Sequence, residues 1–133
     1  MNVRYFDNAA TTRVKDEVLE EMLPYLKEKF GNPSSMYTIG REAKKAIENA
    51  RERVAKLINC KANEIYFTGS GSESDNTAIK GIAHKRAFKG KHIITSKIEH
   101  PAVLHTCQSL EREGFKVTYL NVNKDGIVDI NQL

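Results

Sequence analysis

The 133-residue chain contains no tryptophan, three prolines and two cysteines. Cys60 and Cys107 do not form a CxxC pair, which argues against both a disulfide framework and a structural zinc site. No apolar run approaches the ~20 residues that a membrane-spanning helix needs. The N-terminal residues lack the apolar stretch of a signal peptide. We therefore expect a cytoplasmic protein without a bound metal.

The composition is that of a folded globular chain. Hydrophobic residues make up 40% and charged residues 29%, which excludes a disordered or fibrous protein. Lysine and arginine number 21 against 17 aspartates and glutamates, so the formal net charge is +4. This surplus suits an anionic ligand, but it is too small and too dispersed to indicate nucleic acid.

The first half of the chain predicts an arm followed by helices. Residues 1–15 have little periodicity and are expected to be extended. Asp16 is a candidate cap for a first helix, which Pro24 should kink or end early. Residues 31–35 have the composition of a loop. Apolar residues spaced three and four apart then predict a helix over 38–58.

The second half alternates between short apolar strands and helices. Strands are expected at 64–68, 92–96 and 115–122, with helices at about 72–88 and 101–113 between them. This order predicts an α/β fold with a parallel sheet and right-handed crossovers. Because three parallel strands leave a wide edge uncovered, we expect this chain to be the front part of a larger protein.

A glycine- and serine-rich loop, residues 68–76, joins the first predicted strand to a helix. Free N–H groups at a helix start, together with the helix dipole, form an anion site that suits phosphate. Ser70 and Ser72 add hydroxyl donors. The alternative is that Ser72 and Asp75 merely form a local cap.

Neither common nucleotide fingerprint fits this loop. A dinucleotide site requires glycine or alanine where Ser74 stands, and an acidic residue near the end of the next strand, where Ser96 and Lys97 stand. A P-loop requires Gly-Lys-Ser/Thr where Ser74 and Asp75 stand. The phosphate-bearing ligand is therefore of another kind.

His100 follows the strand predicted at 92–96. Ligands of parallel sheets collect beyond the carboxyl ends of the strands, so His100 should lie at the same edge as the phosphate loop. Its imidazole could stack on a flat cofactor or move protons. The alternative is a helix cap or a surface residue. The remaining histidines are interpreted as surface or core residues: His84, His92 and His105.

Four ordered blocks carry a family resemblance that covers essentially the whole chain. They are Asp7-Asn8-Ala9-Ala10-Thr11-Thr12, Gly31-Asn32-Pro33-Ser34-Ser35, the loop from Thr68 to Asn76 with Thr77-Ala78-Ile79-Lys80-Gly81 after it, and Ile98-Glu99-His100-Pro101-Ala102-Val103-Leu104. Together they resemble the N-terminal part of a cysteine desulfurase, a pyridoxal-phosphate enzyme of the class-V aminotransferase family.

The resemblance implies the fold of the aspartate-aminotransferase type (fold type I) and a homodimer. Residues 16–133 would begin the large cofactor-binding domain, with 1–15 as its arm. Gly71 and Ser72 match the residues that hold the phosphate of pyridoxal 5'-phosphate, and His100 matches the histidine that stacks on its ring and transfers protons. L-Cysteine would be converted to alanine and an enzyme persulfide, which supplies a sulfur acceptor or iron–sulfur scaffold protein.

Parts of the family pattern differ or are absent. Ser72 replaces the usual threonine and keeps its hydroxyl, whereas Tyr37 stands where a histidine is common. The resemblance places the cofactor-bearing lysine, the acidic partner of the ring, the persulfide cysteine and the carboxylate-binding arginine beyond Leu133. Cys60 and Cys107 are interpreted as packing residues. We therefore expect the isolated chain to be inactive.

Two other interpretations remain open. One is another class-V enzyme such as selenocysteine lyase, because the residues that separate these activities are not in the chain. The other is a non-catalytic fragment that binds a phosphate ligand or a partner protein. The incomplete sheet argues against this second alternative.

Overall fold

The computed structural model describes residues 4–133, which divide into two compact units. The first unit ends at Tyr66 and the second begins at Phe67. Residues 4–15 contain no helix or strand and are exposed. The division between an arm and a large domain at Asp16 stays a prediction.

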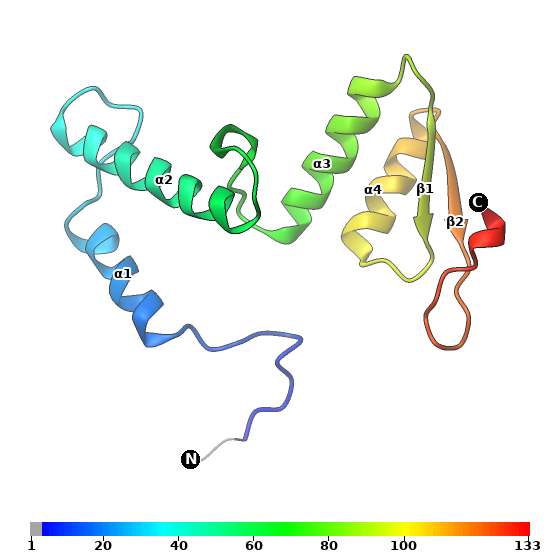
Figure 1. Ribbon diagram of the computed structural model, residues 1–133, viewed down its shortest axis with the longest axis horizontal. Helices are drawn as coiled ribbons and strands as arrows, with labels where there is room; N and C mark the ends of the chain where they lie inside the picture. The colour runs from blue at the N-terminus through cyan, green and yellow to red at the C-terminus, as the bar shows by residue number, and fades with distance from the viewer. Residues whose placement is uncertain (1–3) are drawn as a thin grey trace. The chain divides into compact units, whose positions relative to one another are not determined.

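The first unit begins with α1, Asp16–Lys27 (Figure 1). The expectation that Asp16 caps this helix was wrong: Lys15 is the N-cap and makes no side-chain cap bond. Asp16 is the first helical residue, and its Oδ1 accepts a hydrogen bond from Arg13 at 3.0 Å. The helix also continues past Pro24 to Lys27. The φ angle that proline imposes is compatible with a helix. The helix can therefore continue through Pro24, although the missing N–H removes one backbone hydrogen bond.

Helix α2, Thr38–Leu57, confirms the prediction from apolar spacing. Its buried residues are small, and one of them, Gly40, lies under the loop that precedes the helix. A Cβ at Gly40 would lie 2.6 Å from the carbonyl oxygen of Asn32 and would also collide with that of Ser35. The loop at 31–35 therefore packs directly on the first turn of α2, which only glycine allows.

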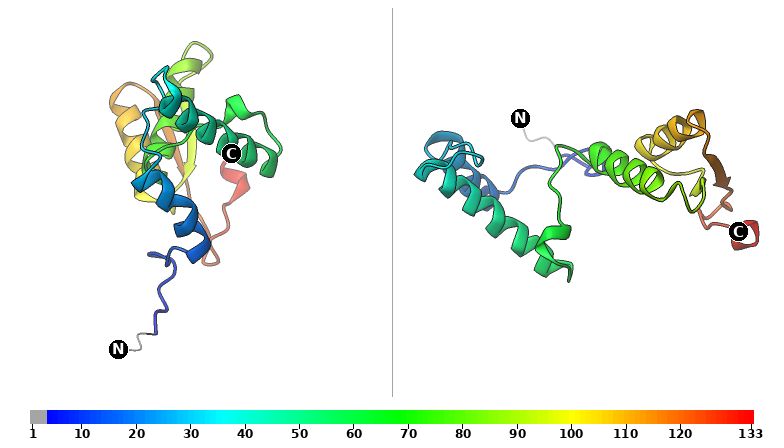
Figure 2. Two further views of the ribbon diagram at one scale, coloured as in Figure 1. Left: turned by 90° about the vertical axis from the view of Figure 1, so that its left-hand side faces the viewer. Right: turned by 90° about the horizontal axis from the view of Figure 1, so that it is seen from above.

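The second unit contains α3 (Gly71–Arg86), β1 (His92–Ser96), α4 (Pro101–Arg112) and β2 (Lys116–Leu120). β1 and β2 pair in parallel, from His92 opposite Lys116 to Ser96 opposite Leu120. α4 packs on β2, and α3 packs along α4. Both helices run opposite to the strands, so their first turns lie at the end of the unit where the strands finish (Figures 1 and 2).

The core of this unit is formed by α4 and the segment that follows it. Leu110, Cys107 and Thr106 are fully buried on α4, and Phe115 and Leu120 are buried around β2. Gly114 ends the helix as predicted, because its φ of +88° suits a residue without a side chain. The predicted α/β architecture with a parallel sheet is confirmed.

The strand expected at 64–68 does not form. Ala62–Glu64 is a short 3-10 helix, η1, and Ile65 is extended without a hydrogen-bonded neighbour strand. A β-strand requires such a neighbour, and residues 4–133 provide none for this segment. The sheet consequently has two strands, and the expected βαβαβ order is reduced to βαβ.

The last segment also differs from the expectation. β2 ends at Leu120, two residues before the predicted end, and Val122 instead forms an antiparallel bridge with Val128. A short 3-10 helix, η2 (Ile130–Gln132), closes the described chain. No helix within residues 4–133 is long and apolar enough to cross a bilayer.

Candidate functional site

The start of α3 is held by a reciprocal side-chain cap. Ser70 is the N-cap, and its Oγ accepts a hydrogen bond from the backbone N–H of Glu73 at 3.2 Å. Glu73 Oε2 in turn accepts from the N–H of Gly69 at 2.7 Å. This resembles a capping box displaced by one residue. A local cap therefore exists, but Ser70 and Glu73 form it rather than Ser72 and Asp75.

Two backbone donors remain free at this helix start. Within residues 4–133, the N–H groups of Gly71 and Ser72 and the Ser72 hydroxyl have no hydrogen-bond partner. A Cβ built at Gly71 would meet nothing within 4 Å, so the backbone there is open to a ligand. The positive end of the helix dipole lies at the same place. These donors fit a phosphate group.

The loop around these donors is fixed by its own side chains. Thr68 Oγ1 donates to the carbonyl of Ser70 at 3.1 Å and accepts from Ser74 Oγ at 2.6 Å. Asn76 Nδ2 donates to the carbonyl of Ser72 at 2.9 Å. The Ser70-x-x-Glu73 spacing is the sequence signature of the capping box, whereas no local sequence pattern indicates the contacts of Thr68 and Asn76. The free donors are thus held in place before any ligand binds.

His100 occupies the N-cap position of α4. Its Nδ1 accepts a hydrogen bond from the N–H of Ala102 at 3.1 Å, so the proton of the neutral ring is assigned to Nε2. The residue is exposed. His100 therefore caps the helix, and capping through Nδ1 leaves both the ring face and Nε2 available.

The turn before His100 is fixed by two further contacts. Ser96 Oγ donates to Glu99 Oε1 at 2.9 Å, and the N–H of Lys97 donates to the carbonyl of Leu120 at 3.0 Å.

Since α3 and α4 begin at the same end of the unit, the structure brings Gly71, Ser72 and His100 to one edge (Figure 1). This is the edge expected from the sequence.

The two cysteines differ in their surroundings. Cys107 is buried, and its pKa is raised by burial and further by the carboxylates of Glu111 and Glu99. A thiol held in its protonated form is a poor nucleophile. Cys60 is half-buried, and its Sγ donates to the carbonyl of Lys61 at 3.6 Å. Both are free thiols.

The other histidines serve structural contacts or lie in solvent. His84 Nε2 lies 2.7 Å from Glu113 Oε2, and His92 Nε2 lies 2.8 Å from Thr118 Oγ1 on the neighbouring strand. His105 is exposed. No group of three or more potential metal ligands is found among residues 4–133.

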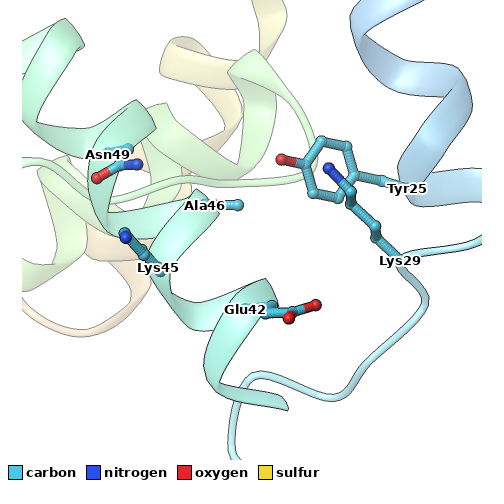
Figure 3. A pocket seen from close by; sticks show the side chains of 6 residues that line it. All are labelled: Tyr25, Lys29, Glu42, Lys45, Ala46 and Asn49. Atoms are coloured by element: carbon cyan, nitrogen blue, oxygen red, sulfur yellow. The ribbon is translucent and has the colours of Figure 1, made fainter. Parts of the chain in front are cut away.

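The hollows of the first unit contain none of the predicted site residues. The one shown in Figure 3 has a volume of ≈ 330 Å³. Its lining mixes two cations, one carboxylate and neutral side chains, namely Tyr25, Lys29, Glu42, Lys45, Ala46 and Asn49. Tyr37, the N-cap of α2, is exposed and makes no side-chain cap bond.

Comparison with known proteins identifies the class. Residues 4–133 match the class-V aminotransferase family, and the chain belongs to this family. Pyridoxal 5'-phosphate is the cofactor of that family, and the free donors at the start of α3 fit its phosphate.

The chain is also similar to individual proteins of known name. The chain is 59% identical over 129 residues to "Cysteine desulfurase IscS" from Clostridium botulinum, covering 97% of this chain and 32% of that protein. It is 60% identical over 129 residues to the protein of the same name from Methanosarcina thermophila, with the same two coverages of 97% and 32%.

Solved structures agree with this similarity. A "NifS-like protein" superposes with a TM-score of 0.91 at 46% identity, covering 96% of this chain and 35% of that one. A structure described as "SspA in complex with cysteine" gives a TM-score of 0.90 at 45% identity, covering 98% of this chain and 38% of that one. The chain thus spans about a third of the length of the relatives it matches.

Proposed function

We propose that the protein carrying this chain is a pyridoxal-phosphate-dependent cysteine desulfurase, and that this chain supplies the phosphate and ring contacts of the cofactor site. The observation that carries the proposal is the pair of unpartnered N–H groups of Gly71 and Ser72 at the edge where His100 caps α4. The 59% identity to a protein named cysteine desulfurase supports it.

Gly71 and Ser72 bind the phosphate. Their two N–H groups point out of the start of α3, and the Ser72 hydroxyl adds a third donor. The Ser70–Glu73 cap holds these groups in place, so little conformational entropy is lost when the phosphate binds. The glycine at position 71 leaves room for close approach of the ligand.

His100 covers the aromatic ring of the cofactor and moves a proton. Its Nδ1 is engaged by the Ala102 N–H, which fixes the ring and leaves the proton on Nε2. In this tautomer Nε2 carries the proton that His100 can give, and it takes a proton back only after that one has left. When bound, the cofactor supplies an electron sink that acidifies the Cα proton of an amino-acid substrate.

The substrate and partners follow from the same proposal. L-Cysteine loses its sulfur to a cysteine thiolate of the enzyme, leaving L-alanine and a persulfide that a sulfur-acceptor or iron–sulfur scaffold protein receives. Neither buried Cys107 nor half-buried Cys60 suits that role. The proposal includes a homodimer and residues 16–133 as the start of the cofactor-binding domain. The two free thiols are in keeping with a cytoplasmic location.

The test is production of alanine from L-cysteine by the protein that carries this chain. Alanine and sulfide should form with cofactor and a reductant present. His100→Ala should lower kcat by about 10²-fold or more, because a positioned general acid–base contributes that much. Cofactor retention should change far less. Unchanged turnover in this variant would remove His100 from the mechanism.

A substrate comparison separates the enzymatic alternatives. L-Selenocysteine is supplied in parallel with L-cysteine at equal concentration. A desulfurase should have substantial activity on L-cysteine. Activity on L-selenocysteine alone would instead identify a selenocysteine lyase.

A further inference from the structure

The two helices whose first turns carry the proposed cofactor contacts are joined at their opposite ends. His84, in the last turn of α3, donates from Nε2 to Oε2 of Glu113, the C-cap residue of α4, at 2.7 Å. The His84 ring also lies near the ring of Phe115, with centroids 6.0 Å apart and planes tilted by 53°. Lys91 Nζ stands 5.6 Å from the centroid of Phe115. α3, α4 and the start of β2 therefore meet at this cluster.

This bond is the only polar side-chain link between α3 and α4 within residues 4–133. α3 has no fully buried residue, and its half-buried positions include Ile79 and Ala83. Only these two half-buried residues of α3 are apolar, so packing alone holds the axial position of α3 less firmly than a fully buried face would. A directional bond at the helix ends adds an axial constraint to this packing.

We propose that the His84–Glu113 hydrogen bond sets the axial position of α3 along α4, and thereby the placement of the Gly71 and Ser72 donors relative to His100. The inference rests on the proposed function of those three residues. His84 and Glu113 are then positioning residues that never touch the cofactor.

The mechanism depends on the stiffness of α3. His84 and Ser72 are separated by roughly 18 Å of helix at 1.5 Å per residue. Because backbone hydrogen bonds keep a helix from shortening, an axial shift at its last turn is carried to its first turn. The half-exposed His84–Glu113 pair should change an equilibrium only about two- to fivefold. Loss of this pair should therefore weaken cofactor binding without destroying the site.

The test compares two variants of Glu113 in the protein that carries this chain. Glu113→Ala removes the acceptor and should weaken pyridoxal 5'-phosphate binding about two- to fivefold. It should also shift the phosphorus-31 resonance of the bound cofactor, because the donors around the phosphate move. Glu113→Gln retains an acceptor oxygen for His84 Nε2 and should leave both values near those of the unmodified protein.

The matched control is Glu111→Ala. Glu111 lies on the same helix and accepts a hydrogen bond from the Tyr119 hydroxyl on β2 at 3.0 Å, with no bond to α3. Its removal deletes the same charge and a comparable surface bond. The dissociation constant and the phosphorus resonance should both stay unchanged.

Two results would overturn the positioning role: Glu113→Ala indistinguishable from Glu111→Ala, or Glu113→Gln as impaired as Glu113→Ala. Ser72→Ala, measured in parallel, separates this failure from failure of the proposed function. If Ser72→Ala weakens cofactor binding while Glu113→Ala does not, only the positioning role is wrong. If Ser72→Ala and Glu113→Ala both have no effect, the contact of the Ser72 hydroxyl with the phosphate and the positioning role are both wrong.

Discussion

Ser70 Oγ accepts the backbone N–H of Glu73 at 3.2 Å, so one donor of the first turn of α3 stabilises the fold and the two before it remain free. The same turn thereby has two separable functions. Substitution of Ser70 should affect folding, whereas substitution of Ser72 should affect ligand binding.

Ser70→Ala should lower the free energy of unfolding by about 1 kcal/mol, the usual cost of losing an N-cap oxygen. Ser72→Ala is the matched control, because the Ser72 hydroxyl is exposed and has no partner among the described residues. It should change stability by less than about 0.5 kcal/mol. Denaturant unfolding of the protein that carries this chain measures both. Equal destabilisation by the two variants would contradict the assignment of Ser70 as the cap.

Gly40→Ala should destabilise the first unit by about 1–3 kcal/mol, the range typical of overpacking. The new Cβ would lie 2.6 Å from the carbonyl oxygen of Asn32, and the loop would have to move. Gly81→Ala is the control, because a Cβ there meets nothing within 4 Å and a helix interior favours alanine. Thermal unfolding should show Gly81→Ala neutral or stabilised. A tolerated Gly40→Ala would mean that the loop at 31–35 does not pack on α2.

Alkylation should distinguish the two thiols. Cys60 is half-buried and should react with iodoacetamide in the native chain, whereas Cys107 is buried and its pKa is raised by that burial. Peptide mass spectrometry before and after denaturation measures the modification at each site. Rapid labelling of Cys107 in the native chain would show that the core around α4 opens.

Tyr119 should ionise at a higher pH than an ordinary tyrosine. Burial raises its pKa from the ordinary value of 10 to about 12, and the hydrogen bond to Glu111 adds to the effect. A raised pKa favours the protonated folded state, so this contribution to stability is complete below pH 10 and declines as the pH rises toward 12. Ultraviolet titration should therefore lose its highest step in Tyr119→Phe. A titration curve unaltered at its alkaline end would contradict the hydrogen bond between Tyr119 and Glu111.

The elements predicted best are those whose pattern is local. The 3.6-residue spacing of α2 and the glycine at position 114 determine their structure without reference to distant residues. The strand expected at 64–68 does not form because a β-strand requires a neighbouring strand to pair with. The apolar residues Ile65 and Phe67 do not indicate whether such a strand is present.

The candidate site likewise has features that the sequence predicts and features that it does not. That Gly71, Ser72 and His100 share an edge could be predicted, because parallel βα units place helix starts together. The identity of the cap could not be predicted as easily, since Ser70 and Ser72 each have an acidic residue three positions later. Only the backbone geometry selects Ser70 with Glu73.

The central claim is that the first amides of α3 bind the phosphate of the cofactor. The most direct measurement is an amide NMR titration of the cofactor-free protein that carries this chain with pyridoxal 5'-phosphate, and separately with pyridoxal, which lacks the phosphate. Saturable shifts should be largest at Gly71 and Ser72 and should require the phosphate. Equal shifts with pyridoxal, or the absence of shifts at these two amides, would contradict the claim.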